Sequence, residues 1–165
     1  MDVTLVPYGN EADTAVKLII QFWQAHNHET PSYEEAAEDL TQWTKEGHRL
    51  YFIRYGGEAV GFVHLGSRGG EIDWLEELFV LPEFQGRGIG TRAIALAEEI
   101  VKAYSESFYI EAAARNEKAI RLYRKLGYDC LNTITIRKDF QAERFETLST
   151  ERILGMDFRV KRYKE

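Results

Sequence analysis

The chain has 165 residues, 44% of them hydrophobic and 13% aromatic, which suits one globular domain with an apolar core. Charged residues make up 29%, near the globular average, so the composition excludes a disordered chain. The net charge of −6 argues against general nucleic-acid binding, and no apolar run approaches the roughly 20 residues of a membrane span. We therefore expect neither nucleic acid nor a membrane among its partners.

The N-terminal sequence and the cysteine content predict a cytoplasmic protein. Residues 1–4 lack the basic and apolar regions of a signal peptide. The one cysteine, Cys130, excludes an internal disulfide framework and fits a reducing compartment. We expect Cys130 in a buried strand, without a catalytic role, because no matched histidine motif accompanies it.

Charge is unevenly distributed along the chain. Residues 1–48 carry a net charge of −7, residues 49–114 carry −4, and residues 115–165 carry +5. Such a bipolar protein is suited to binding a cation at one end and an anion at the other. Solvated surface charge would give the same distribution, so both interpretations stay open.

The first half of the chain predicts one strand and two helices, followed by three strands. Residues 5–6 form the first strand, which Pro7 ends. Apolar residues then recur at three- and four-residue spacing, which predicts an amphipathic helix from Ala12 to His26. Ser32 is expected to cap a second helix that runs to Lys45. The strands that follow are expected at residues 50–55, 59–65 and 72–81, with a hairpin turn at Gly56-Gly57 between the first two.

The second half predicts helices and strands in alternation. The longest helix begins near Gly88, and Gly127 is expected to end a later one. An alternating run near the C-terminus indicates an edge strand. The expected segments are a strand at residues 108–113, a helix at 116–126, a strand at 131–136 and the edge strand at 158–161.

This order of elements predicts the fold class. It is an α+β fold, an α/β sandwich with one mixed, mostly antiparallel central sheet flanked by helices. We expect a single domain over residues 1–165. Residues 141–165 form a C-terminal extension that adds an edge strand or hairpin.

A glycine-rich turn, Pro82 to Thr91, joins the strand of residues 72–81 directly to the longest helix. Glycine permits positive φ and lets a ligand approach the backbone. The free N–H groups of the first helical turn, with the positive end of the helix dipole, favour a phosphate. By itself, however, such a turn can also serve geometry alone.

Two other phosphate-binding motifs do not fit this turn. A P-loop requires a Gly-Lys-Ser/Thr ending, which is absent. A dinucleotide-binding fingerprint requires a glycine where Thr91 stands, and it opens a βαβ unit rather than following a meander.

The turn does resemble a known family. Gln85-Gly86-Arg87-Gly88-Ile89-Gly90 matches the Gln/Arg-x-x-Gly-x-Gly/Ala signature of the GNAT superfamily of N-acetyltransferases. A second segment, residues 116–128, is similar to the family's second cofactor motif, with Asn116 and Tyr123 seven residues apart. The resemblance covers roughly residues 1–140, and the last ~25 residues lie outside its motifs.

The resemblance implies acetyl-CoA as the acetyl donor and assigns residues to it. The turn would hold the pyrophosphate, and a bulged strand before it would offer backbone N–H groups to the thioester and pantetheine. Asn116 resembles the residue that bonds the pantetheine arm. The cofactor-binding residues that follow are Phe79, Val80, Gln85, Gly86, Arg87, Gly88, Ile89, Gly90, Thr91, Asn116 and Tyr123.

Acetyl transfer to an amine requires a base, because an alkylammonium of pKa ~10 is almost wholly protonated at neutral pH. Glu76 and Glu77 interrupt the apolar strand before the turn. Under simple alternation they point to opposite faces, so at most one faces the site. The family position ten residues before Gly86 often carries the base, which favours Glu76. A bulge changes the alternation, so Glu77 stays the second choice, and two solvated carboxylates remain the alternative.

Tyr123 is the candidate acid. Helical periodicity alone indicates a core residue. In the family, the hydroxyl at this position reaches the cofactor sulfur and can donate a proton to the departing thiolate. The resemblance therefore favours a catalytic role.

The acceptor site is expected in the first two helices and their connection, because the family uses this region for the acceptor. The candidate residues there are Trp23, His26, Glu29 and Tyr33. The −7 charge of residues 1–48 and an aromatic side chain available for cation–π contact predict a cationic amine, a small molecule or a basic peptide. The four histidines show no metal-ligand spacing, so no metal is expected.

The resulting functional hypothesis is an acetyl-CoA-dependent N-acetyltransferase that acts directly on a primary amine. A non-catalytic acyl-CoA-binding regulatory or interaction protein on the same fold is the alternative. The basic strand near the C-terminus is a candidate homodimer contact, since exposed strand edges invite pairing.

Overall fold

The computed structural model describes residues 2–165, which form two compact units, the first ending at Glu111 and the second spanning Ala112–Glu165. The first unit contains β1 (Val3–Pro7), α1 (Ala12–Asn27), α2 (Tyr33–Thr44), β2 (His48–Tyr55), β3 (Glu58–Gly66), β4 (Trp74–Val80), the 3₁₀ turn η1 (Pro82–Phe84), α3 (Ile89–Lys102) and β5 (Tyr109–Ile110). The second contains α4 (Glu117–Lys125), η2 (Ala142–Arg144), β6 (Phe145–Ile153) and β7 (Met156–Tyr163).

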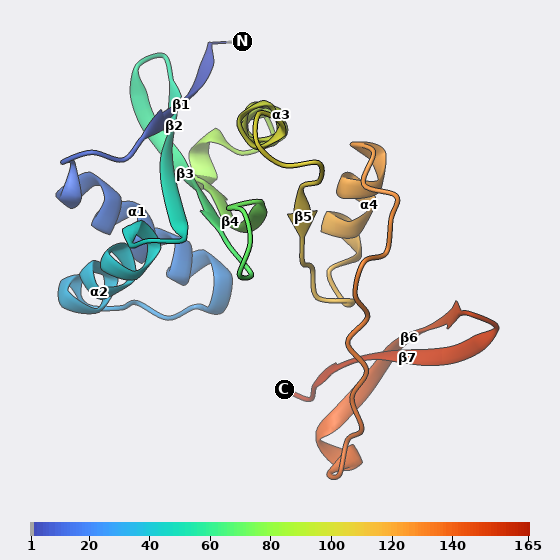
Figure 1. The fold of residues 1–165 in the computed structure, drawn as a ribbon. Helices are drawn as coiled ribbons and strands as arrows, with labels where there is room; N and C mark the ends of the chain where they lie inside the picture. Colours follow the sequence, from blue (N-terminus) through green and yellow to red (C-terminus); the bar gives the residue numbers. More distant parts are fainter. Residues whose placement is uncertain (1) are drawn as a thin grey trace. The chain divides into compact units, whose positions relative to one another are not determined.

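The first unit is organised around a five-stranded sheet with the order β1-β2-β3-β4-β5. Neighbouring strands are antiparallel except β4 and β5, which are parallel. Helices α1 and α2 lie together on one face of this sheet, and α3 covers the other (Figure 1). The predicted mixed, mostly antiparallel sheet flanked by helices is confirmed.

The apolar core explains this layering. On the α1/α2 face, Phe22 of α1 meets Phe62 of β3 and Phe79 of β4 with edge-on ring contacts. On the other face, Ile89 and Ala93 of α3 are fully buried. Alternate residues of each strand therefore serve opposite faces. We refer below to the first of these as the α1/α2 face.

Local sequence signals define the ends of several elements. Ser32 caps α2 in a complete capping box: its hydroxyl accepts from the N–H of Glu35, and the Glu35 carboxylate accepts from the N–H of Ser32. Gly56 and Gly57 both take positive φ, which the tight β2–β3 turn requires. These two predictions are confirmed.

In the second unit, the predicted strand at residues 131–136 is wrong. This segment has no regular secondary structure, and Leu131 and Ile136 are 76% and 67% exposed. Alternating Thr and Ile supply strand propensity, but a strand also needs a hydrogen-bonded neighbour, and none of the described strands pairs with this segment. Cys130, expected in a buried strand, lies exposed in the same irregular stretch.

The C-terminal residues form an antiparallel hairpin of β6 and β7, a second sheet where the sequence predicted an edge strand or hairpin. The alternating run 158–161 lies within β7, while β6 was not predicted. The turn places Leu154 and Gly155 at positive φ, the arrangement of a type I′ hairpin. Asparagine or aspartate usually precedes the glycine of such a turn, so Leu154 gave no turn signal.

Candidate active site

Strand β4 contains a β-bulge at Glu76. His64 of β3 pairs with Glu77 and Leu65 pairs with Leu75, so Glu76 is the extra residue between two regular pairs. Gly66 of β3 makes room for it, because a Cβ at Gly66 would lie 2.4 Å from Oε1 of Glu76. The bulge turns the Glu76 side chain over β3.

The bulge also places both carboxylates on the α1/α2 face, where simple alternation predicts opposite faces. Glu76 occupies the space above Gly66, and Glu77 contacts the ring of His64. Gly66 and His64 are two residues apart on β3, so they share a face with Phe62. One extra residue in β4 has therefore brought two like charges side by side.

Each carboxylate is paired with a cation or a polar ring. Glu76 is held by the guanidinium of Arg68, which donates to both of its oxygens, with Nη2 at 3.0 Å from Oε2. Hydrogen bonding to Glu76 raises the pKa of Arg68 further above its usual value. Arg68 is 45% exposed and also stacks on Trp74 with its guanidinium carbon 4.6 Å from the ring centre. An incoming cation can compete for this carboxylate.

Glu77 begins a chain of hydrogen bonds that crosses three strands. Its carboxylate contacts Nδ1 of His64, and Nε2 of His64 lies 2.9 Å from Nδ1 of His48 on β2. Trp43 of α2 stacks on His64 with ring centres 4.8 Å apart. We call His48, His64 and Glu77 the histidine chain.

Beyond the bulge, one edge of β4 lacks a partner strand. Within residues 2–165, β5 pairs with β4 only at Trp74 and Leu75. Phe79 and Val80 remain paired with β3 on the other edge. Backbone N–H groups alternate between the two edges, so part of β4 presents donors to an open side. The resemblance to the family predicts that backbone N–H groups of this strand bind the thioester and pantetheine.

The turn after β4 has the backbone geometry of an anion site. Gly86 and Gly88 take φ of 73° and 77°, and no heavy atom lies within 4 Å of a Cβ built on Gly86. Gly88 is the N-cap of α3, so the first N–H groups of that 14-residue helix have no intrahelical acceptor. This cradle of glycine backbone at a helix N-terminus fits a pyrophosphate.

The long side chains of the turn stabilise its shape. Gln85 donates from Nε2 to the carbonyl of Val80 at 2.8 Å, which ties the turn to the end of β4. Arg87 donates to the carbonyl of Glu83 at 2.9 Å and lies over the ring of Phe84. Thr91, in the first turn of α3, is exposed, whereas Ile89 is buried in the core.

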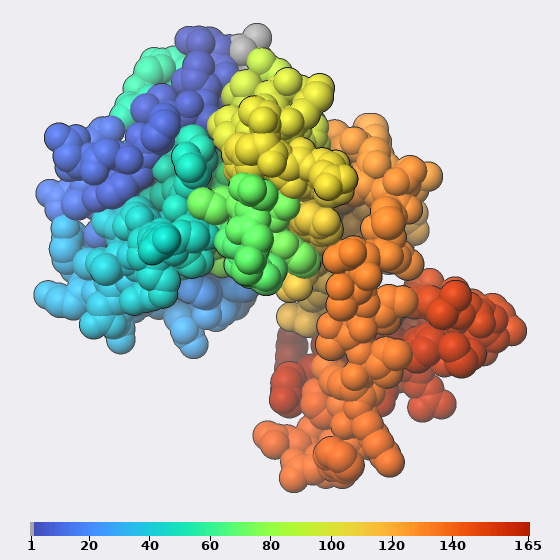
Figure 2. Space-filling view, viewed as in Figure 1, coloured from blue at the N-terminus to red at the C-terminus, as the bar shows by residue number. Residues whose placement is uncertain are grey.

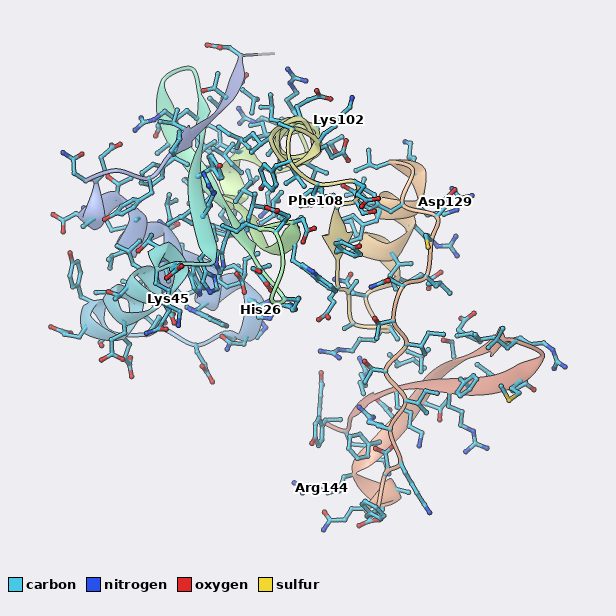
Figure 3. The ribbon with its side chains drawn as sticks, viewed as in Figure 1. His26, Lys45, Lys102, Phe108, Asp129 and Arg144 are labelled. Atoms are coloured by element: carbon cyan, nitrogen blue, oxygen red, sulfur yellow. The ribbon has the colours of Figure 1, made fainter. Side chains whose placement is uncertain are left out.

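The structure brings together only part of the predicted acceptor region. His26 stacks on Phe22 at 5.3 Å and contacts Trp23, whose indole N–H donates to Asp39 at 2.8 Å. Phe22 in turn contacts Phe79, two residues from Glu77, so this end of α1 adjoins the carboxylates. In Figure 3, His26 and Lys45 are labelled at the ends of α1 and α2.

The other two predicted acceptor residues are placed differently. Glu29 accepts a hydrogen bond from the Asn27 amide in the loop after α1. Tyr33 donates to Asp13 in the first turn of α1, and this bond raises the pKa of the Tyr33 hydroxyl. Since Asp13 and His26 are thirteen residues apart on one helix, the Tyr33 hydroxyl at Asp13 lies roughly 20 Å along α1 from His26.

The second unit carries Asn116 and Tyr123 on α4. Asn116 is the N-cap, and its Oδ1 accepts from the N–H of Ala119 at 3.3 Å, which leaves the amide nitrogen as a donor. Tyr123 is half-buried, and burial raises the pKa of its hydroxyl above its usual value. The ring of Tyr128 packs edge-on against it at 6.1 Å. Tyr123 therefore keeps its proton at neutral pH.

Sequence reasoning missed Arg68 and the connection among His48, His64 and Glu77. A signal was present: His64 interrupts one apolar strand, as Glu77 interrupts the next. Their pairing depended on a register that the sequence pattern does not define.

Across residues 2–165, no three His, Cys, Asp or Glu side chains are arranged to hold a metal ion. No helix in that range is long and apolar enough to span a membrane.

Comparison with known proteins finds relatives among enzymes named for amine acetylation. The chain is 33% identical over 92 residues to spermidine N(1)-acetyltransferase of Escherichia coli K12, a match covering 50% of this chain and 46% of that protein. It is 30% identical over 83 residues to the thialysine N-epsilon-acetyltransferase of Mus musculus, covering 50% and 47%. It thus spans about half the length of the curated relatives it matches.

A solved structure shares the fold. AAC(6')-Iy, crystallised with the bisubstrate analogue CoA-S-monomethyl-acetylneamine, aligns with a TM-score of 0.60 at 18% identity, covering 84% of this chain and 99% of that one. The family model of the Acetyltransferase (GNAT) family matches residues 16–128, which include the bulge, the turn, Asn116 and Tyr123. On this match, the chain belongs to the GNAT acetyltransferase family.

Proposed function

We propose that this protein transfers the acetyl group of acetyl-CoA directly to a primary amine that carries a positive charge. One observation carries the proposal: β4 has a bulge with two carboxylates near one end and the glycine turn at the other, along a partly open edge. If the turn and the open edge of β4 hold the thioester, the two carboxylates of the bulge can bind an ammonium beside it. The names of the relatives support an amine acceptor.

The charge of the first unit favours a cationic acceptor. Residues 1–48 carry a net charge of −7, and Trp23 and His26 form an aromatic group next to Phe22. Glu76 already pairs with a cation, the exposed guanidinium of Arg68. The acceptor ammonium would displace Arg68 from this carboxylate. Polyamines, aminoglycoside-like amines and basic peptides have the required charge.

Each predicted residue has a role in the proposed reaction. Glu76, or Glu77 as second choice, takes a proton from the ammonium, and the neutral nitrogen attacks the thioester carbonyl. A C–N bond forms and the C–S bond breaks. The backbone N–H groups around Phe79 and Val80 would stabilise the negative oxygen, and Tyr123 would donate a proton to the thiolate. The nitrogen loses a second proton as the amide forms, and this proton restores the Tyr123 hydroxyl. The products are an amide, free CoA and one proton.

The acceptor class is tested with a panel of amines. We expect thiol release from acetyl-CoA with spermidine, an aminoglycoside or a lysine-rich peptide, and weaker release with neutral or acidic amines of similar size. Thiol release and mass spectrometry of the product measure the outcome. Preference for acidic or neutral amines would contradict the cationic acceptor, and CoA binding without turnover on any amine would favour the non-catalytic alternative.

Replacing the predicted base changes the pH dependence. We expect Glu76→Gln to lower kcat most below neutral pH, because without a base only the amine that is already neutral reacts, and this fraction falls about tenfold per pH unit below a pKa of ~10. The measurement is kcat from about pH 6 to about pH 9. Glu71→Gln, an exposed change in the same β3–β4 connection, is the control. Parallel pH profiles for wild type and Glu76→Gln would remove Glu76 from the mechanism.

The C-terminal hairpin remains our candidate for a homodimer contact. Each of its two strands has one unpaired edge within the described hairpin, and β7 carries Arg159, Lys161 and Arg162. Unpaired edges can add a strand from a second copy. The mass of the protein in solution, with and without residues 141–165, tests this contact.

A further inference from the structure

Among residues 2–165, His64 is the one polar or charged residue that is buried, at 3% exposure. Both of its ring nitrogens have partners, the Glu77 carboxylate at Nδ1 and His48 at Nε2. Glu77 is 26% exposed, and His48 is only partly covered. The histidine chain therefore links two partly exposed groups through a buried one, a connection that packing of an apolar sheet does not require.

The hydrogen bonds define where the protons sit. A carboxylate only accepts, so Nδ1 of His64 donates to Glu77. Neutral His64 then has a lone pair at Nε2, which accepts from Nδ1 of His48 at 2.9 Å. This leaves the lone pair of His48 at its outer nitrogen, Nε2. The histidine chain can therefore take up one proton, at Nε2 of His48.

The surroundings oppose a positive charge on His48. Burial, the positive form of His64 and Lys45 lower the pKa of His48 from its usual value, whereas Glu76 and Glu77 oppose that shift. The ring of His48 stacks on that of His64 at 5.1 Å. Gly47, next to His48, lies against Ser67 of the β3–β4 connection, and Figure 2 shows these segments, cyan and green, adjacent at the surface.

We propose that His48 receives the proton that the base removes from the acceptor ammonium and returns it to solvent, with His64 and Glu77 holding the charge in between. The inference rests on the proposed function, since acetylation of an ammonium releases one proton per turnover. Glu76 lies over Gly66, and Gly66 is the cross-strand partner of His48, so the two side chains share a face and a water molecule between them is a short route.

The transfer balances without another reactant. A proton binds Nε2 of His48, and the Nδ1 proton of His48 moves to Nε2 of His64. Two N–H bonds form and one breaks, so the chain gains one proton. The positive charge comes to rest on His64 beside the negative carboxylate of Glu77, which stabilises it. The reverse movement releases the proton from Nε2 of His48 and resets the chain.

His48→Asn separates this role from a structural one. The Asn amide can still donate to His64 but cannot accept and pass on a proton. We expect kcat to fall about tenfold or more, with KM for acetyl-CoA and for the amine unchanged. Added imidazole should restore much of the lost rate, because a small diffusible base can replace the missing proton carrier. Thermal unfolding of the variant verifies that it folds, and His48→Gln serves as a second variant.

The pH profile gives an independent measurement. Because the pKa of His48 is lowered, its ring gains a proton at a lower pH than an ordinary histidine, so we expect the wild-type kcat to decline on the acidic side of neutral pH. His48→Asn should lose this decline. Lys45→Gln removes a positive neighbour that lowers the pKa of His48. In this variant, kcat should therefore begin to decline at a higher pH than in the wild type.

The outcomes distinguish the two proposals. An active wild type together with an unchanged kcat in His48→Asn, or a reduced kcat that imidazole does not restore, overturns the proton relay alone. A wild type that acetylates no amine overturns the proposed function and, with it, the relay. Rescue by imidazole together with the shifted profile of Lys45→Gln supports the relay.

Discussion

Tyr123→Phe is expected to lower kcat about 100-fold or more while leaving both KM values nearly unchanged. The hydroxyl would donate the proton that the CoA thiolate takes up as it leaves. Burial raises the pKa of Tyr123 above its usual value, so the hydroxyl keeps its proton through the neutral range and the wild-type kcat should fall on this account only at alkaline pH. Phenylalanine retains the half-buried ring and its contact with Tyr128.

Steady-state kinetics with saturating acetyl-CoA measure this effect. Tyr163→Phe removes a hydroxyl from a 64% exposed tyrosine at the end of the hairpin and should behave as wild type. A full kcat in Tyr123→Phe would show that the hydroxyl is dispensable and that Tyr123 serves α4 only as a packing residue.

Gly61→Ala is expected to destabilise the first unit by about 3 kcal/mol or more, because the strands meet there backbone to backbone. A Cβ at Gly61 would lie 2.0 Å from the carbonyl oxygen of Phe79 and 3.0 Å from Cα of Val80. Backbone atoms within a sheet cannot move aside as a flexible side chain can. Strands β3 and β4 would have to separate at the end of β4, just before the glycine turn.

Thermal or urea unfolding measures the loss, and a drop in Tm of roughly 6–12 °C corresponds to it. Gly70→Ala is the matched control: it lies in the connection between the same two strands, and a Cβ at Gly70 would meet nothing within 4 Å. An unchanged Tm in Gly61→Ala would mean that β3 and β4 are farther apart at Phe79 than the structure has them.

Elements with strong local signals could be predicted from the sequence. The capping box at Ser32, the Gly56-Gly57 turn and the glycine turn before α3 each depend on residues close together in the chain. The same holds for Asn116, whose position at the start of α4 was predicted and is observed. Local geometry restricts the backbone directly, so the pattern is sufficient.

Elements that depend on distant partners were less predictable. The segment 131–136 has the alternation of a strand but no pairing partner among the described strands. Strand β6 formed because β7 pairs with it, across a turn whose first residue, Leu154, is atypical. Strand propensity is therefore realised only where a neighbouring strand completes the hydrogen bonds.

The sequence by itself determined the family signature, the α/β sandwich and the candidates Glu76, Glu77 and Tyr123. The tertiary structure decided how the two carboxylates are placed, because the bulge at Glu76 brings both to one face. It also decided their partners, Arg68 and the ring of His64. Those contacts join different strands, or a strand and the connection before it. A shift of one residue in the pairing of two strands moves every side chain of the shifted strand to the opposite face of the sheet. That register comes from packing across the whole sheet, which no local pattern specifies.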